Sequence, residues 1–119
     1  MNSSHMTTPY TAEACGGGFL ANSDSYFEVG MENENFYGWG PEDGERLKRW
    51  RILERRIGWV KGSMFHLTHP RGMNSNFRSQ KDKIKLLNEA DRIASMSKIE
   101  LTNEINNWNI LRREREALF

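Results

Sequence analysis

The chain has 119 residues, enough for one small domain, and its formal net charge of +1 gives no overall basic field for nucleic acid. Its single cysteine, Cys15, excludes an internal disulfide framework and is typical of a reducing compartment. No apolar run approaches the roughly 18 residues that a membrane helix needs, and no signal-peptide pattern is visible at the start. These features predict a cytoplasmic protein, attached to a membrane only through other parts of a longer chain. Hydrophobic residues make up 37% and the mean hydropathy is -0.77, which indicates a fragment or a domain that completes its core with a neighbour.

Residues 1–14 are polar and lack periodicity, so we expect a flexible N-terminal segment in which His5 is a poor ligand candidate. Whether residues 1–5 are natural chain is left open by the sequence. Gly16, Gly17 and Gly18 follow, and two interpretations remain equal: a backbone edge against a ligand, or a turn before a short buried strand over residues 19–21. The glycine run lacks the lysine and spacing of a phosphate loop.

A short helix is predicted from Ser23, a natural N-cap, to a stop at Gly30. A second helix is predicted over residues 41–55, because Pro41 suits the first helical position. Its apolar stripe and its i,i+4 ion pairs are expected to be Leu47, Trp50 and Leu53, and Glu42–Arg46 and Glu45–Arg49. The basic run over residues 46–56 is interpreted as a solvated helix face, with nucleic-acid binding a weak alternative.

The start of that second helix carries the main functional signal. Glu42 and Asp43 fall in its first turn, where backbone N–H groups and the helix dipole favour negative charge. Tyr37 and Trp39, just before them, offer flat apolar faces. Two fixed carboxylates beside aromatic rings suit a polyhydroxylated ligand, since rings stack on sugar C–H faces and carboxylates accept hydroxyl hydrogens. The alternative interpretation is ordinary helix capping with aromatic packing.

Residues 57–62 and 63–70 alternate in the manner of two strands. His66 and His69 would then point to opposite faces unless a turn at Pro70 brings them together, and two histidines alone are a weak metal signal. Arg71, in the polar loop that follows, is a candidate anion ligand or an exposed side chain.

Two further helices are predicted from their caps, and both are interpreted as structural. Ser79 and Ser97 each precede an acid at the third helical position, which is typical of N-caps. Apolar stripes follow each cap, and they are expected to be Ile84, Leu87, Ala90, Ile93 and Ala94 in the first helix and Leu101, Ile105, Trp108 and Leu111 in the second.

Three pieces of the chain, taken together, resemble a known family. Gly17-Gly18-Phe19, then Phe36 to Asp43, then Met64-Phe65-His66 are similar in order and rough spacing to the C-terminal part of nucleotide-sugar glycosyltransferases with the GT-A fold. The nearest groups are galactosyltransferases, N-acetylgalactosaminyltransferases and chondroitin-polymerase-type enzymes. Their Trp-Gly-Gly-Glu-Asp motif is present here with Pro41 in place of the second glycine. The resemblance covers residues 15–72 and leaves out the C-terminal helices.

The resemblance implies a role for each matched residue. Trp39, with Tyr37 beside it, would stack on a sugar, and Asp43 or Glu42 would bind the acceptor hydroxyl and remove its proton; which of the two is the base is left open. Gly17 and Gly18 would lie beneath the sugar nucleotide, with Arg71 an added anion ligand. His66 would bind the Mn²⁺ that bridges the donor diphosphate in this family, and His69 has no certain counterpart.

The resemblance also implies an organisation and partners. We expect an α+β chain, the C-terminal portion of a GT-A fold, with residues 15–78 as the acceptor and metal side and residues 79–119 as a C-terminal helical pair. The Asp-x-Asp motif of the family does not occur in the sequence. The chain is therefore predicted to be part of a longer transferase of polysaccharide biosynthesis, with little or no Mn²⁺ binding and no activity alone, and with an exposed sheet edge that permits self-association. Its partners would be a nucleotide-sugar donor, a glycan acceptor and the missing N-terminal half, without nucleic acid. The alternative is a non-catalytic carbohydrate-binding or protein-interaction module.

Overall fold

The computed structural model describes residues 15–119, and the predicted flexible segment over residues 1–14, with His5, lies outside that range. The elements in chain order are α1 (Ser23–Glu28), α2 (Glu42–Ile52), the short 3-10 helix η2 (Met73–Ser75), α3 (Gln80–Ala94) and α4 (Lys98–Glu116). Within residues 15–119 no helix combines the length and the apolar character needed to cross a bilayer.

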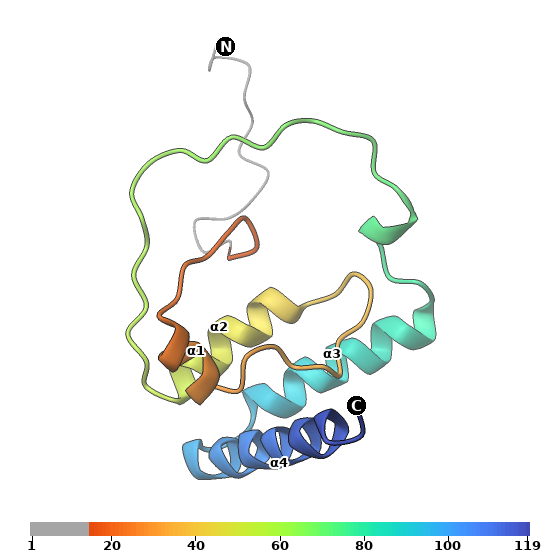
Figure 1. Ribbon diagram of the computed structural model, residues 1–119. Helices are drawn as coiled ribbons and strands as arrows, with labels where there is room; N and C mark the ends of the chain where they lie inside the picture. The colour runs from red at the N-terminus through yellow and green to blue at the C-terminus, as the bar shows by residue number, and fades with distance from the viewer. Residues whose placement is uncertain (1–14) are drawn as a thin grey trace.

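Helix α2 is the centre of the packing. It packs more extensively against α3 than against α4, and Figure 1 shows α3 and α4 following each other below it. The core lies where these helices meet: Ile93, Leu101 and Ile105 form one buried cluster, with Ile52, Leu53, Met96 and Trp108 packed around it. The end of α3 and the first half of α4 therefore supply the buried apolar cluster, and the residues that follow α2 pack against it.

The caps of the two C-terminal helices are confirmed. The Ser79 hydroxyl accepts from the backbone N–H of Asp82, and Ser97 and Glu100 form a reciprocal capping box at the start of α4. The apolar face of α3 differs from the prediction, because Leu86 and Ile93 are buried whereas Ile84 and Leu87 are exposed. The reason is that the loop before α2 lies on α3: a Cβ added to Gly40 would be 3.2 Å from Leu86 Cδ1.

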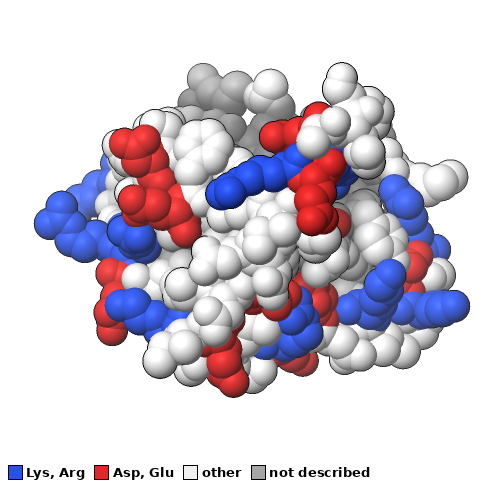
Figure 2. Space-filling view, turned by 60° about the horizontal axis from the view of Figure 1, so that its bottom comes forward, with Lys and Arg blue, Asp and Glu red and all other residues white. Residues whose placement is uncertain are grey.

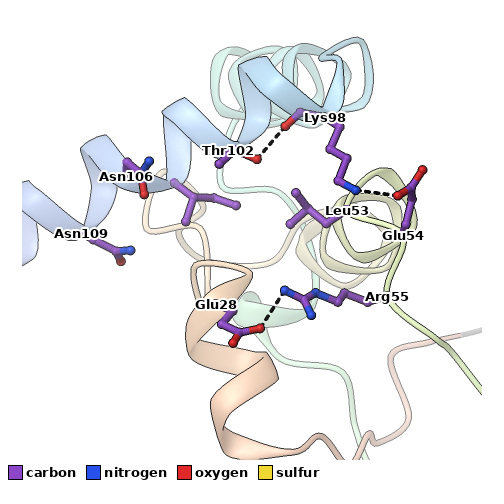
Figure 3. Close-up of a pocket in the computed structure, with 9 residues that line it drawn as sticks. Glu28, Leu53, Glu54, Arg55, Lys98, Thr102, Asn106 and Asn109 are labelled. Atoms are coloured by element: carbon purple, nitrogen blue, oxygen red, sulfur yellow. Dashed lines mark hydrogen bonds and ion pairs between the residues drawn. The ribbon is translucent and has the colours of Figure 1, made fainter.

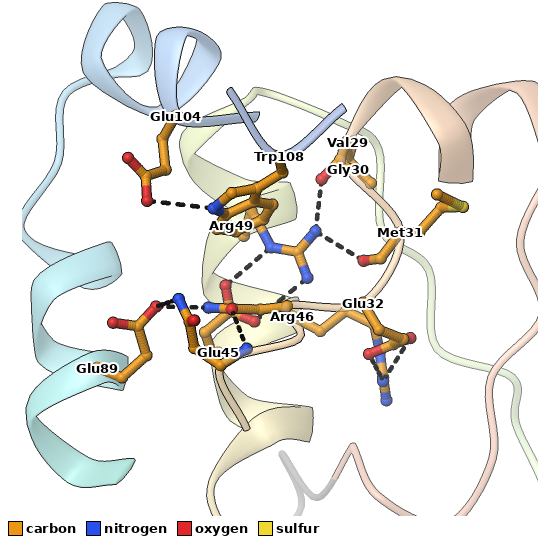
Figure 4. A network of polar contacts seen from close by, with 12 residues as sticks. Val29, Gly30, Met31, Glu32, Glu45, Arg46, Arg49, Glu89, Glu104 and Trp108 are labelled. Carbon is orange, nitrogen blue, oxygen red and sulfur yellow. Dashed lines mark hydrogen bonds and ion pairs between the residues drawn. The ribbon is translucent and has the colours of Figure 1, made fainter. Parts of the chain in front are cut away.

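A buried ion pair, and not an apolar stripe, faces inward from α2. Arg49 is fully buried, its Nε donates to Glu45 Oε1 at 2.8 Å, and its Nη1 donates to the carbonyls of Val29 and Met31. The Glu45–Arg49 pair was predicted, but its burial was not, since Leu47, Trp50 and Leu53 were expected on that face; they are half-buried. Figure 4 shows the guanidinium of Arg49 between α2 and the turn after α1.

A second arginine fastens the same turn to α4. Arg112 donates to the carbonyls of Gly30 and Glu32 and to the carboxylate of Glu34. Gly30 has φ +85°, and a Cβ there would lie 3.0 Å from Ile105, so the turn needs a glycine both for its backbone and for its contact with the core. Residues 29–34 are thereby held between α2 and α4. This turn leads directly into the loop that carries Tyr37 and Trp39.

The expected α+β fold, a C-terminal portion of a GT-A fold, is wrong for the described residues, which contain no strand and no sheet. The segments over residues 19–21, 57–62 and 63–70 are irregular, and Figure 1 shows residues 53–79 as a long open path from α2 to α3. From residue 56 to residue 71 no backbone–backbone hydrogen bond is formed within the described chain. A strand pattern becomes a strand only beside a partner that pairs its N–H and C=O groups, and nothing between residues 15 and 119 lies there. The predicted sheet edge for self-association is therefore not found in this range.

Candidate functional site

The acid pair lies at the start of α2, as predicted, with slightly different helix bounds. Helix α2 begins at Glu42 and ends at Ile52, so Pro41 is the N-cap and not the first helical residue. Among residues 15–119, no side-chain hydrogen bond caps this end of α2. Glu42 and Asp43 are consequently the first two residues whose carboxylates meet the positive end of the α2 dipole.

Asp43 is held in place by a neighbouring cation. Its Oδ1 accepts a hydrogen bond from Arg46 Nη2, and Arg46 Nη1 donates to both carboxylate oxygens of Glu32. The Arg46 guanidinium lies 4.2 Å from the centre of the Phe19 ring, which covers its other side. The side chain of Arg46 is only 12% exposed whereas that of Asp43 is 38% exposed, so the cation is enclosed and the carboxylate is open to solvent.

Glu42 is in a different position from the predicted one. The Glu42–Arg46 pair does not form, because Arg46 binds Asp43 and Glu32. Glu42 Oε2 is shielded from solvent and has no hydrogen-bond donor among the described residues. A carboxylate oxygen out of water without a donor is costly, and a ligand hydroxyl reaches this one only when the Glu42 side chain turns outward.

The glycine run lies against the acid pair. A Cβ added to Gly16 would be 2.6 Å from Asp43 Oδ2, and one added to Gly17 would be 1.9 Å from Met64 Cε, whereas Gly18 has open space around it. A larger residue at Gly16 or Gly17 would therefore require the side chain of Asp43 or Met64 to shift. Because His66 follows Met64 by two residues, its Cα is within about 8 Å of the Met64 Cα. Gly16 therefore lies beside Asp43, and Gly17 lies beside Met64, two residues before His66.

The aromatic side chains before α2 lie over the start of α3. Tyr37 Oη donates to Asp82 Oδ1 at 2.7 Å, and this hydrogen bond raises the pKa of Tyr37 and lowers the pKa of Asp82. Trp39 stands edge-on to Phe77, with ring centres 4.9 Å apart, and is 44% exposed. Tyr37 is therefore committed to a structural contact, and Trp39 is the ring that offers surface to a ligand.

The two histidines lie in the open segment between α2 and α3. The rings of His66 and His69 have centres 5.3 Å apart and both side chains are exposed. Among residues 15–119 no group of three or more histidine, cysteine or acidic side chains is gathered to hold a metal ion. Mn²⁺ prefers several oxygen ligands in octahedral geometry, and two imidazoles do not fit that requirement. Arg71 is also exposed, in the same segment.

A groove that the sequence did not indicate lies at the other end of α2. Its volume is about 630 Å³, and Figure 3 shows it between the end of α1, the end of α2 and α4. Ion pairs cross it on two sides, Glu28 with Arg55 and Glu54 with Lys98. Since α2 has 11 residues, it separates this groove from the acid pair by about 16 Å. The four charged side chains of the groove are already paired with one another, which makes it a less suitable ligand site than the acid pair.

Charges of both signs are mixed over the face shown in Figure 2, which carries acidic and basic side chains around a neutral centre. Such a face has no single-sign field that attracts a polyanion over a wide area. Binding specificity, on this face, has to come from local groups.

Comparison with known proteins gives no assignment: no family model matches the chain, and neither the curated proteins nor the solved structures contain a match.

Proposed function

We propose that this chain supplies the acceptor-binding part of a glycosyltransferase, which moves a galactose- or N-acetylgalactosamine-type sugar from a nucleotide-sugar donor to a hydroxyl of a glycan. The observation that carries the proposal is the condition of the acid pair: Asp43 is fixed by Arg46 but open, and Glu42 Oε2 lacks a donor. An acceptor sugar bound here meets two carboxylates at the dipole end of α2 and an exposed indole two residues upstream of Pro41.

The chemistry follows from these positions. A sugar hydroxyl attacks the anomeric carbon of the donor faster when a positioned carboxylate accepts its proton. Asp43 Oδ1 is occupied by Arg46, which leaves Oδ2, on the side of Gly16, to accept that proton. Glu42, with its side chain turned outward, then orients the sugar by accepting a second hydroxyl hydrogen at the oxygen that lacks a donor. The assignment of base and orienting group is part of the proposal.

The donor side requires more than the described residues provide. Two imidazoles do not form a Mn²⁺ site, so we derive no step through a metal and place the donor diphosphate and its ion in the remainder of a longer protein. His66, Gly17 and Gly18 stay predicted donor-side residues. The purified 119-residue chain is accordingly expected to transfer no sugar, and transfer by it from a uridine-diphosphate sugar would contradict this division of labour.

The test is made in the longest natural protein that contains this chain. Asp43→Asn and Glu42→Gln keep shape and remove charge; we expect the base variant to lower kcat by about a hundredfold or more and the orienting variant to act mainly on the acceptor KM. Glu114→Gln, an exposed acid near the end of α4, is the matched control and should leave both constants unchanged. If both site variants retain normal transfer, the acid pair has no catalytic role.

A non-catalytic carbohydrate-binding module gives a different outcome in the same experiment. Such a protein binds an oligosaccharide through Trp39 and the acid pair but responds neither to Mn²⁺ nor to a uridine-diphosphate sugar. Titration of both, with and without an acceptor oligosaccharide, separates the module from the transferase.

A further inference from the structure

Three cations surround the aromatic side chains beside the acid pair. Arg78 Cζ is 5.7 Å and Lys85 Nζ is 5.2 Å from the centre of the Tyr37 ring, and Lys83 Nζ is 5.9 Å from the centre of the Phe77 ring. We name Tyr37, Trp39, Phe77, Arg78, Lys83 and Lys85 the aromatic–basic patch. It is built from the loop before α2 and the first turns of α3, two parts of the chain that are far apart in sequence.

The patch is positive in a chain that is otherwise nearly neutral. Residues 78–85 contain four cations and one carboxylate, whereas the whole chain has a net charge of only +1. The one carboxylate, Asp82, accepts a hydrogen bond from the hydroxyl of Tyr37 at Oδ1. Within residues 15–119 the cations Arg78, Lys83 and Lys85 form no ion pair, so their charge is available to a ligand.

The patch is continuous with the acid pair. A Cβ added to Gly38 would be 3.0 Å from the Arg78 guanidinium, and a Cβ added to Gly40 would be 3.4 Å from Glu42 Oε2. One short loop therefore touches the cations at one end and the carboxylates at the other. In the sequence, Trp39 lies between Gly38 and Gly40. Four peptide units, about 15 Å when fully extended, join Trp39 to Asp43.

These groups match a sugar chain that carries negative charge. The two ends of the loop carry opposite charges and therefore suit different groups of the sugar chain. The cations suit an acidic substituent, and the carboxylates accept hydroxyl hydrogens. We propose that the acceptor is an anionic glycan, whose carboxylate or sulfate group binds at Arg78, Lys83 and Lys85 while a neighbouring sugar lies on Trp39. This inference rests on the proposed function and adds the charge of the acceptor to it.

A single-stranded nucleic acid is the less suitable occupant. Its binding sites usually present several open aromatic faces in succession, on which consecutive bases stack. In this patch two cations lie over the Tyr37 ring, and Trp39 and Phe77 are in edge-on contact. The indole of Trp39 is therefore the one open aromatic surface.

The experiment compares matched ligands on the 119-residue chain by calorimetric or fluorescence titration. The probes are a hyaluronan hexasaccharide, the same oligosaccharide with its carboxylates reduced, a sulfated galactan oligosaccharide and its desulfated form, and a dT oligonucleotide. We expect each anionic glycan to bind more tightly than its neutral counterpart, by about five- to tenfold for two surface charges. The advantage should shrink as salt increases. Carboxylate and sulfate sources are distinguished by which of the two pairs shows the larger difference.

Charge variants then locate the effect. Lys83→Gln with Lys85→Gln should remove most of the preference, and the same two positions changed to arginine should keep it. Lys48→Gln with Arg51→Gln, two exposed cations on α2, is the matched control and should have no effect. Circular dichroism of each variant checks that the helices are intact.

The outcomes separate this inference from the proposed function. Equal binding of charged and neutral oligosaccharides, sensitive to Glu42→Gln or Asp43→Asn, overturns the anionic acceptor and supports the glycan site. Binding of the oligonucleotide alone overturns both, and absence of binding to every oligosaccharide also overturns both.

Discussion

At the scale of single residues, the structure depends on arginines that reach backbone carbonyls. Arg49 and Arg112 together hold the turn over residues 29–34, through the carbonyls of Val29, Met31, Gly30 and Glu32. Arg49 also lies 5.5 Å from the centre of the Trp108 ring, so one guanidinium connects α2, the turn and α4. Burial raises the pKa of Glu45, and the hydrogen bonds and charge of Arg49 act in the opposite direction.

Removal of Arg49 should therefore be severe. Arg49→Met leaves the Glu45 carboxylate buried without a cation, and we expect a loss of about 3–5 kcal/mol in the free energy of unfolding. The double variant Arg49→Met with Glu45→Leu removes the uncompensated charge and should recover part of that loss. Urea unfolding measures both. A single variant that costs less than about 1 kcal/mol would contradict the role assigned to this pair.

Sequence patterns predicted single residues well only where the reason is local. The caps Ser79 and Ser97 depend on a few consecutive residues, and both were predicted correctly. The fate of Glu42 depends on whether Arg46 turns toward it or toward Asp43 and Glu32, and helical spacing does not show that the fold brings Glu32 to Arg46. Periodicity alone did not indicate that an arginine would be the buried side chain of α2.

At the scale of elements, the helices and the open segment between α2 and α3 differ in how well the sequence predicted them. The starts of α3 and α4 followed from their serine caps, because those signals are local, whereas α1 is capped by Asn22 and not by Ser23. Helix α2 runs from Glu42 to Ile52 and is shorter than the predicted range 41–55. The strand predictions over residues 57–62 and 63–70 were wrong because pairing depends on a neighbour, and the described chain offers none. The segment instead exposes large apolar side chains: Trp59, Val60, Met64, Phe65 and Leu67.

Limited proteolysis should reveal this difference. We expect trypsin to cut first after Arg56, Lys61 or Arg71, which are exposed and lie in backbone without internal hydrogen bonds. The two resulting pieces should stay together, because α2 packs against α3 across the cut. Mass spectrometry identifies the sites and size-exclusion chromatography the association. Earlier cleavage within α3 or α4, or immediate separation of the pieces, would contradict the described packing.

At the scale of the whole molecule, a network of carboxylates joins the loops to the helices. Glu89 on α3 accepts from Asn33, Asn35 and Arg92, and Arg92 continues to Glu104 on α4. Burial alone would raise the pKa of Glu89, but the hydrogen bonds from Arg92, Asn33 and Asn35 outweigh it and lower the pKa to about 2. Hydrogen bonds from Arg115 and Arg112 likewise lower the pKa of Glu34 to about 2.

These shifts predict a loss of stability in acid. A carboxyl whose folded pKa lies below its unfolded value stabilises the fold above the unfolded pKa and loses that contribution as pH falls through the folded pKa. For Glu89 the window runs from the ordinary glutamate pKa of 4.5 down to about 2. The free energy of unfolding should therefore fall between pH 5 and pH 2, and Glu89→Gln should make the fall shallower. Glu114→Gln is the control, and identical pH profiles for Glu89→Gln and the parent chain would contradict the network.

The candidate site was predicted from the sequence only in part. Its residue types, an aromatic loop followed by two acids, were evident in the sequence, and so was their place at a helix start. The contribution of Arg46, the closeness of Gly16 to Asp43 and the cations of α3 were not, because each requires the fold to bring distant segments together. The sheet implied by the family resemblance requires strand partners that the described chain does not contain.

The most direct test of the account is a titration of the isotopically labelled chain with oligosaccharides, followed by amide chemical shifts. Binding at the proposed place predicts shifts in residues 37–44 and in the first turns of α3, with the end of α4 unchanged, and loss of the shifts in the Asp43→Asn variant. Shifts confined to the groove at the other end of α2, or shifts that persist undiminished in that variant, would contradict the claim that the acid pair receives a sugar.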